Sequence, residues 1–73
     1  MIPPVQVLVA SPEEAADFNA ELWLGGELLA VTVLYDGRLH LRIVPRPDGE
    51  PWLIETTSLS LALESATRQI AEL

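Results

Sequence analysis

The dipeptide Asp36-Gly37 lies between two runs of aliphatic residues, and it limits the possible folds of this chain more than any other feature. Both central residues of a type I′ turn need a positive φ, which Asp and Gly tolerate well. We therefore predict a hairpin formed by residues 28 to 35 and 38 to 44. A two-residue loop also sets the register of the two strands. The predicted pairs are Tyr35 with Arg38, Val33 with His40, and Val31 with Arg42.

The register gives the predicted hairpin one apolar face that belongs to the core. Its members are Leu28, Ala30, Thr32, Leu34, Leu39, Leu41 and Ile43. Upstream, apolar and polar residues alternate from Asp17 to Leu24, which favours a strand joined to the hairpin through Gly25-Gly26. In an uninterrupted register, the apolar residues of this strand share a face with the other side of the central strand. The two predicted sets are Phe18, Ala20, Leu22 and Leu24, beside Leu29, Val31, Val33 and Tyr35.

A central strand with two apolar faces has a consequence for assembly. One helix cannot cover both sides of a sheet, so the second side requires the N-terminal segment or another subunit. A chain of 73 residues also buries only about 60% of the surface that its unfolded form exposes. Both arguments favour a homodimer.

A helix is the rival interpretation for residues 12 to 24. Ser11 can cap a helix that begins at Pro12, Glu14 is at the capping-box position, and Gly25 can end the helix. We favour a short turn at residues 12 to 16 followed by a strand.

The remaining segments complete an α+β domain. Alternating Val5, Val7 and Val9 predict an edge strand, and the proline-rich residues 45 to 51 predict a loop. Trp52 to Thr56 should return as a further strand. Apolar residues recur at helical spacing after Ser58, which predicts a helix from about residue 58 to 72 with Thr57 or Ser58 as N-cap. We expect a single domain, residues 1–73, with an antiparallel β-meander of four to five strands and one C-terminal α-helix packed on one face.

The predicted helix carries the pattern Ser58-Leu59-x-x-Ala62-Leu63-Glu64-x-Ala66. Over these residues it resembles the helix of HicB-like antitoxin domains, and the resemblance implies a helix packed on a small antiparallel sheet. The proline-glycine segment typical of the sheet in those domains is missing here, so no functional residue is transferred from them.

Positive charge is concentrated in one short stretch of an acidic chain whose formal net charge is −7. It consists of Arg38, His40, Arg42 and Arg46, whereas residues 1 to 37 contain no base. Alternate positions on a strand project from one face, so Arg38, His40 and Arg42 should form a row able to bind carboxylates or phosphates. The alternative is that they keep an exposed edge strand soluble and prevent its aggregation.

We expect a partner-binding surface made of Arg38, His40, Arg42 and Arg46 with the aromatic residues Tyr35 and Trp52. Aromatic residues dominate binding hot spots, although in so small a domain they also serve in the core. The excess of acidic residues disfavours nucleic acid as the partner.

Several function classes are excluded or disfavoured by composition. The chain has no Cys, which excludes disulfides, Cys-ligated metals and thiol catalysis. His40 is the sole histidine, and no suitably spaced acid or nucleophile accompanies it. We therefore expect no enzyme activity, no metal and no cofactor. No apolar run is long enough to span a membrane, and the N-terminus lacks the basic region of a signal peptide, which favours the cytoplasm.

These observations predict a non-catalytic protein-interaction module, a small homodimeric regulator or inhibitor of the antitoxin, immunity or phage counter-defence type, encoded by a bacterial sequence. One alternative is a nucleic-acid-binding regulator that uses Arg38, Arg42 and Arg46. The other is a small-ligand-binding subunit with a pocket between subunits, lined by His40, Tyr35 and Trp52.

Overall fold

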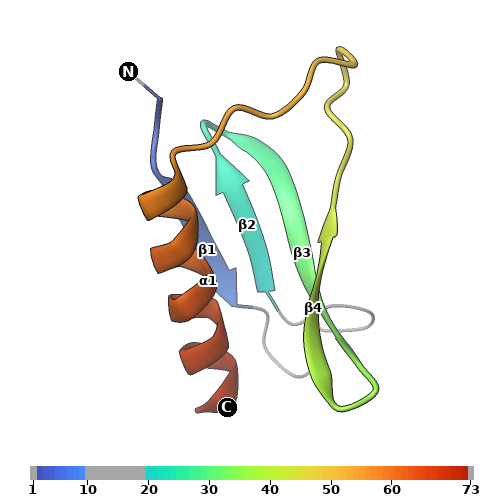
Figure 1. Ribbon diagram of the computed structural model, residues 1–73, viewed down its shortest axis with the longest axis vertical. Helices are drawn as coiled ribbons and strands as arrows, with labels where there is room; N and C mark the ends of the chain where they lie inside the picture. Colours follow the sequence, from blue (N-terminus) through green and yellow to red (C-terminus); the bar gives the residue numbers. More distant parts are fainter. Residues whose placement is uncertain (1, 10–19, 73) are drawn as a thin grey trace.

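The computed structural model describes residues 2–9 and 20–72. They form a four-stranded antiparallel sheet with one C-terminal helix packed on it, which confirms the predicted α+β meander (Figure 1). The strands lie side by side in chain order, β1-β2-β3-β4. The elements are β1 Val5–Val9, β2 Ala20–Leu24, β3 Glu27–Tyr35, β4 Arg38–Ile43 and α1 Thr56–Ala71. In this described part, no helix is long and apolar enough to cross a membrane.

The predicted β3–β4 hairpin is confirmed in both its turn and its register. Asp36 and Gly37 have φ values of 53° and 74°, the positive values that a type I′ turn needs. Tyr35 pairs with Arg38, and the two other predicted pairs, Val33 with His40 and Val31 with Arg42, are also present. The backbone preference of two adjacent residues thus determines how the two strands are aligned.

Residues 20–24 are a strand, so a helix extending to Leu24 is wrong for this part of the segment. The predicted turn at residues 12 to 16 and the start of the predicted strand lie outside the described residues. The predicted edge strand around Val7 is confirmed as β1, which lies beside β2 at one edge of the sheet.

A β-bulge changes which face of β3 is shared with β2. Leu22 pairs with Ala30 but the next residue, Trp23, pairs with Leu28, so Leu29 is an extra residue in β3. One extra residue moves all later side chains to the other face relative to the partner strand. The prediction that Ala20 and Leu22 share a face with Val31 and Val33 is therefore wrong, whereas Leu29 packs with Leu22 as predicted. The predicted place of Phe18 lies outside the described residues.

The bulge also makes the core one-sided. Leu29 and Ala30 are consecutive residues, yet both are buried in the same cluster with Leu22 and Leu24 of β2 and Ala62 of α1. Partly buried side chains complete this core, namely Val5, Val7, Leu41, Trp52, Ile54, Leu59 and Leu63. The second apolar face of β3, on which the dimer prediction partly depended, loses Leu29 to this core and keeps Val31, Val33 and the exposed Tyr35.

The segment between β4 and α1 crosses the end of the sheet without forming the strand predicted at Trp52 to Thr56 (Figure 1). Instead of pairing with a strand, this segment is anchored by the Trp52 indole, whose Nε1–H donates to the Val44 carbonyl oxygen at 2.8 Å. Helix α1 begins at Thr56, earlier than predicted, because the Glu55 carboxylate acts as N-cap and accepts the Ser58 backbone N–H at 2.9 Å.

The helix covers only part of one face of the sheet. Helix α1 packs mainly against β1 and to a smaller extent against β2. The β3–β4 hairpin forms the opposite edge of the sheet, away from the helix (Figure 1). The sheet face that carries the core therefore continues beyond the helix onto the hairpin.

Candidate functional site

Arg38, His40 and Arg42 form one row on β4, as predicted, and we call these residues the cationic row. Their cross-strand partners on β3 are Tyr35, Val33 and Val31, and the row lies on the sheet face opposite α1. All three side chains of the row are exposed, and none of them forms an ion pair with another described residue. Across the sheet, Glu21 of β2 lies in line with Val31 and Arg42, two strands away from the arginine.

His40 is held by its nearest neighbours in the hairpin. Its Nδ1 lies 2.9 Å from the Arg38 carbonyl oxygen, and because a carbonyl only accepts, Nδ1 carries the proton and donates. The imidazole meets the edge of the Tyr35 ring at a centroid distance of 5.6 Å and an interplanar angle of 84°. The ring is thereby oriented with Nε2 left available. Among the described residues, no carboxylate orients this histidine for proton transfer.

The opposite side of the hairpin is apolar and only partly covered. It carries Leu34, Leu39, Leu41 and Ile43, which we call the hairpin apolar row, and cross-strand pairs join Leu34 to Leu39 and Ala30 to Ile43. Leu41 touches the core, but Leu34 and Ile43 are 62% and 59% exposed. The hairpin therefore presents a cationic side and an apolar side at the same edge of the sheet.

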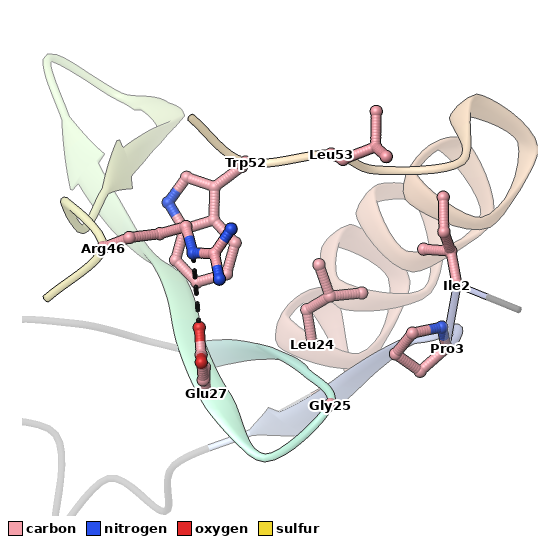
Figure 2. A pocket seen from close by; sticks show the side chains of 8 residues that line it. All are labelled: Ile2, Pro3, Leu24, Gly25, Glu27, Arg46, Trp52 and Leu53. Atoms are coloured by element: carbon pink, nitrogen blue, oxygen red, sulfur yellow. Dashed lines mark ion pairs between the residues drawn. The ribbon is translucent and has the colours of Figure 1, made fainter. Parts of the chain in front are cut away.

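Arg46 and Trp52 lie apart from the cationic row, at the end of the hairpin remote from the turn. Figure 2 shows the Arg46 guanidinium stacked over the Trp52 ring, with its Cζ 5.4 Å from the ring centroid. The guanidinium also lies 3.6 Å from Glu27 Oε2 through Nε and 3.3 Å from Asp48 Oδ2 through Nη2. Its Nη1 donates to the Pro51 carbonyl oxygen at 3.3 Å.

These contacts give Arg46 a structural task. Two carboxylates offset its charge. Cation–π stacking on the Trp52 indole joins two parts of the loop 44–55, and the ion pair with Glu27 holds this loop against β3. Its Nε is buried and has no hydrogen-bond partner in the described part of the chain, since Glu27 is slightly too distant. The six predicted site residues thus form two groups: Tyr35, Arg38, His40 and Arg42 at the hairpin, and Arg46 with Trp52 beside Glu27.

A small open pocket adjoins the second group (Figure 2). It has a volume of about 260 Å³ and is lined by Ile2, Pro3, Leu24, Gly25, Glu27, Arg46, Trp52 and Leu53. Its charged groups, Arg46 and Glu27, already bind each other. The pocket therefore offers apolar walls but no uncompensated charge to a ligand.

The sequence patterns missed two features of these surfaces. Glu27 as the partner of Arg46 depends on how the loop 44–55 returns over β3, which no local spacing records. The exposure of Leu34 and Ile43 was also missed, because both fit the pattern of a core face. Their position beyond the reach of a single C-terminal helix is the signal that could have revealed it.

Neither the comparisons with known proteins nor the arrangement of possible metal ligands assigns a function to this chain. No protein-family model, curated protein or solved structure matches the chain. Among residues 2–9 and 20–72, no group of three or more His, Asp or Glu side chains is arranged to hold a metal ion.

Proposed function

We propose that the chain is a non-catalytic protein-interaction module, a small homodimeric regulator or inhibitor that contacts its partner protein through the β3–β4 hairpin. The observation that carries this proposal is that the hairpin extends beyond the cover of α1 with chemically different sides. One side carries the cationic row, and the other exposes Leu34 and Ile43.

Interfaces of this kind combine apolar contact with arginine and aromatic anchors. Tyr35 fits such an anchor, because it is 69% exposed and its ring position is supported by His40. Its hydroxyl end is available to a partner while the ring buries apolar area at low entropic cost. Arg38 and Arg42 add donors for carboxylates on the partner.

The proposal that the chain is not catalytic depends on the contacts that His40 makes. Its Nδ1–H is directed to a backbone carbonyl and its ring to an aromatic edge. In a catalytic pair or triad, the histidine base lies within hydrogen-bond reach of a nucleophile and of an orienting acid, and no described side chain takes either place beside His40. These contacts instead support a role in shaping the surface.

Site-specific photocrosslinking in the native host tests the proposed surface. A photoreactive phenylalanine analogue at Tyr35 should capture one partner protein, whereas the same analogue at Leu61, 60% exposed on α1, should not. Arg38→Ala combined with Arg42→Ala should abolish the adduct and weaken binding of the purified partner in calorimetry by roughly tenfold or more.

The double variant should keep its thermal midpoint, because neither arginine has an ion-pair partner among the described residues. Equal capture from both positions, capture unaffected by the arginine substitutions, or unfolding of the double variant would each reject the hairpin as a recognition surface.

A further inference from the structure

The outer edge of β4 carries a regular set of outward-directed backbone groups. Val44 donates its N–H to the Leu29 carbonyl at 2.8 Å, so Val44 directs its backbone groups toward β3. Backbone direction alternates along an antiparallel strand, so Arg38, His40 and Arg42 also bond to β3. Leu39, Leu41 and Ile43 therefore direct their N–H and C=O groups away from the sheet. No described residue bonds to these outward groups.

The side chains that flank this edge are of two kinds. Arg38, His40 and Arg42 project on the face opposite α1, and the outward-bonding Leu39, Leu41 and Ile43 project on the helix side. A strand added to β4 would place its own side chains alternately beside these two rows. Acidic residues would lie opposite the cationic row, and apolar residues would extend the hairpin apolar row.

We propose that β4 accepts an extended segment of a partner protein as a fifth strand, and that this segment alternates acidic and apolar residues. The inference rests on the proposed function, and it names the chemistry of the partner. Backbone hydrogen bonds would supply affinity, and the alternation of side chains would supply specificity. Asp36 in the adjoining turn is the described acid nearest this row in the chain, so acidic partner residues fit best opposite His40 and Arg42.

A second copy of the chain does not match this edge. Antiparallel pairing of two β4 strands centred on His40 sets Arg38 of each copy opposite Arg42 of the other, and like charges in cross-strand pairs are destabilising. The opposite edge of the sheet, strand β1, differs from β4 because α1 already contacts it. In β1 the Val5 N–H already donates to the Ser58 hydroxyl at 2.8 Å, and α1 flanks the strand with Leu61 and Ser65.

A synthetic peptide with alternating Glu and Val residues is the direct probe. Titrated into ¹⁵N-labelled protein, it should shift the Leu39, Leu41 and Ile43 amide resonances in a saturable manner and slow their hydrogen exchange. A peptide of the same composition with all Glu residues before all Val residues is the matched control. It keeps the charge but loses the alternation, and it should bind roughly tenfold more weakly or not at all.

Backbone methylation separates strand addition from simple charge attraction. Valine residues opposite Leu39, Leu41 and Ile43 would direct their N–H groups to β4, so N-methylation at valine should abolish binding. N-methylation at glutamate should leave it nearly unchanged. Arg38→Gln with Arg42→Gln should weaken binding by roughly tenfold, while Arg68→Gln on α1 should have no effect.

Three results would overturn the strand-addition model: equal binding of the control peptide, indifference to valine methylation, or amide protection of Leu39 and Leu41 that rises with protein concentration alone. The last result would show that a second copy occupies the edge. Failure of the peptide while the Tyr35 crosslink persists rejects only strand addition, whereas loss of the crosslink with peptide binding intact rejects the proposed cellular interaction.

Discussion

At the scale of single residues, Thr32 places a polar hydroxyl group in the core. It is 2% exposed and lies between Ala20 of β2 and Leu41 of β4. Its hydroxyl has no hydrogen-bond partner among the described residues. A buried hydroxyl that loses water without gaining a partner reduces the free energy of unfolding by about 1 to 3 kcal/mol.

Replacing this hydroxyl with a methyl group should therefore stabilise the fold. Thr32→Val keeps the β-branched shape that suits a strand, and we expect it to raise the free energy of unfolding by about 1 kcal/mol in urea titration. Thr57→Val, at an exposed position in the first turn of α1, is the control and should change stability by less than about 0.5 kcal/mol. A loss of stability in the Thr32 variant would show that the hydroxyl is hydrogen-bonded in solution.

At the element scale, Ser58 links the helix to the edge of the sheet. The sequence pattern makes it a candidate N-cap, but Glu55 caps the helix and the Ser58 hydroxyl accepts the Val5 N–H at 2.8 Å. An edge strand that keeps an unpaired N–H beside a helix loses free energy unless a side chain satisfies it. The serine therefore stabilises the contact between β1 and α1 more than the start of α1.

This assignment predicts an effect of Ser58→Ala at a distance from the helix terminus. We expect a loss of about 1 to 2 kcal/mol in the free energy of unfolding, with faster hydrogen exchange of the Val5 amide and unchanged helix content by circular dichroism. Ser60→Ala, at an exposed site of the same helix, should be neutral or slightly stabilising because alanine has the higher helix propensity. Reduced helicity in the Ser58 variant, with exchange at Val5 unaltered, would instead identify Ser58 as a cap.

The elements that could be predicted are those determined by local chemistry. The β3–β4 hairpin follows from the turn preference of Asp36-Gly37, and the helix follows from its apolar spacing. The bulge at Leu29 could not be predicted, because it arises when two consecutive side chains pack into one core. The strand predicted after Pro51 does not form, because the packing of Trp52 against Val44 and Arg46 determines the path of that segment.

The candidate site divides in the same way between local and tertiary causes. The row of Arg38, His40 and Arg42 follows from strand alternation, which a hairpin register makes reliable. The separation of Arg46 from that row depends on its ion pair with Glu27, a residue nineteen positions earlier in the chain. A contact of this kind is set by the tertiary path of the loop.

At the scale of the whole molecule, the main uncovered apolar surface lies on a different face of the sheet from the one that the sequence predicts. Because of the bulge, the main uncovered apolar surface lies on the helix side of the sheet, where α1 reaches β1 and β2 but leaves Leu34 and Ile43 of the hairpin apolar row exposed. The face opposite α1 instead carries the cationic row, which is unfavourable for pairing with a second copy of the same row. A symmetric dimer is therefore expected to bury the hairpin apolar row and leave Arg38 and Arg42 to another protein.

Sedimentation equilibrium of a double variant tests this arrangement. Leu34→Thr with Ile43→Thr places β-branched residues, which suit strands, at both positions but removes apolar area that appears twice in a symmetric interface. Burial of such side chains stabilises by about 1.5 kcal/mol or more each, so the dimer dissociation constant should rise by more than roughly hundredfold. Leu8→Thr is matched in exposure to Ile43, at 59%, but lies on the other face of the sheet and should leave the dimer intact.

A wild-type chain that sediments as a monomer at micromolar concentration, or a Leu8 variant that dissociates equally, would show that the hairpin apolar row does not mediate self-association. If the double variant is monomeric and still accepts the alternating peptide, self-association and strand addition use separate surfaces of the same hairpin.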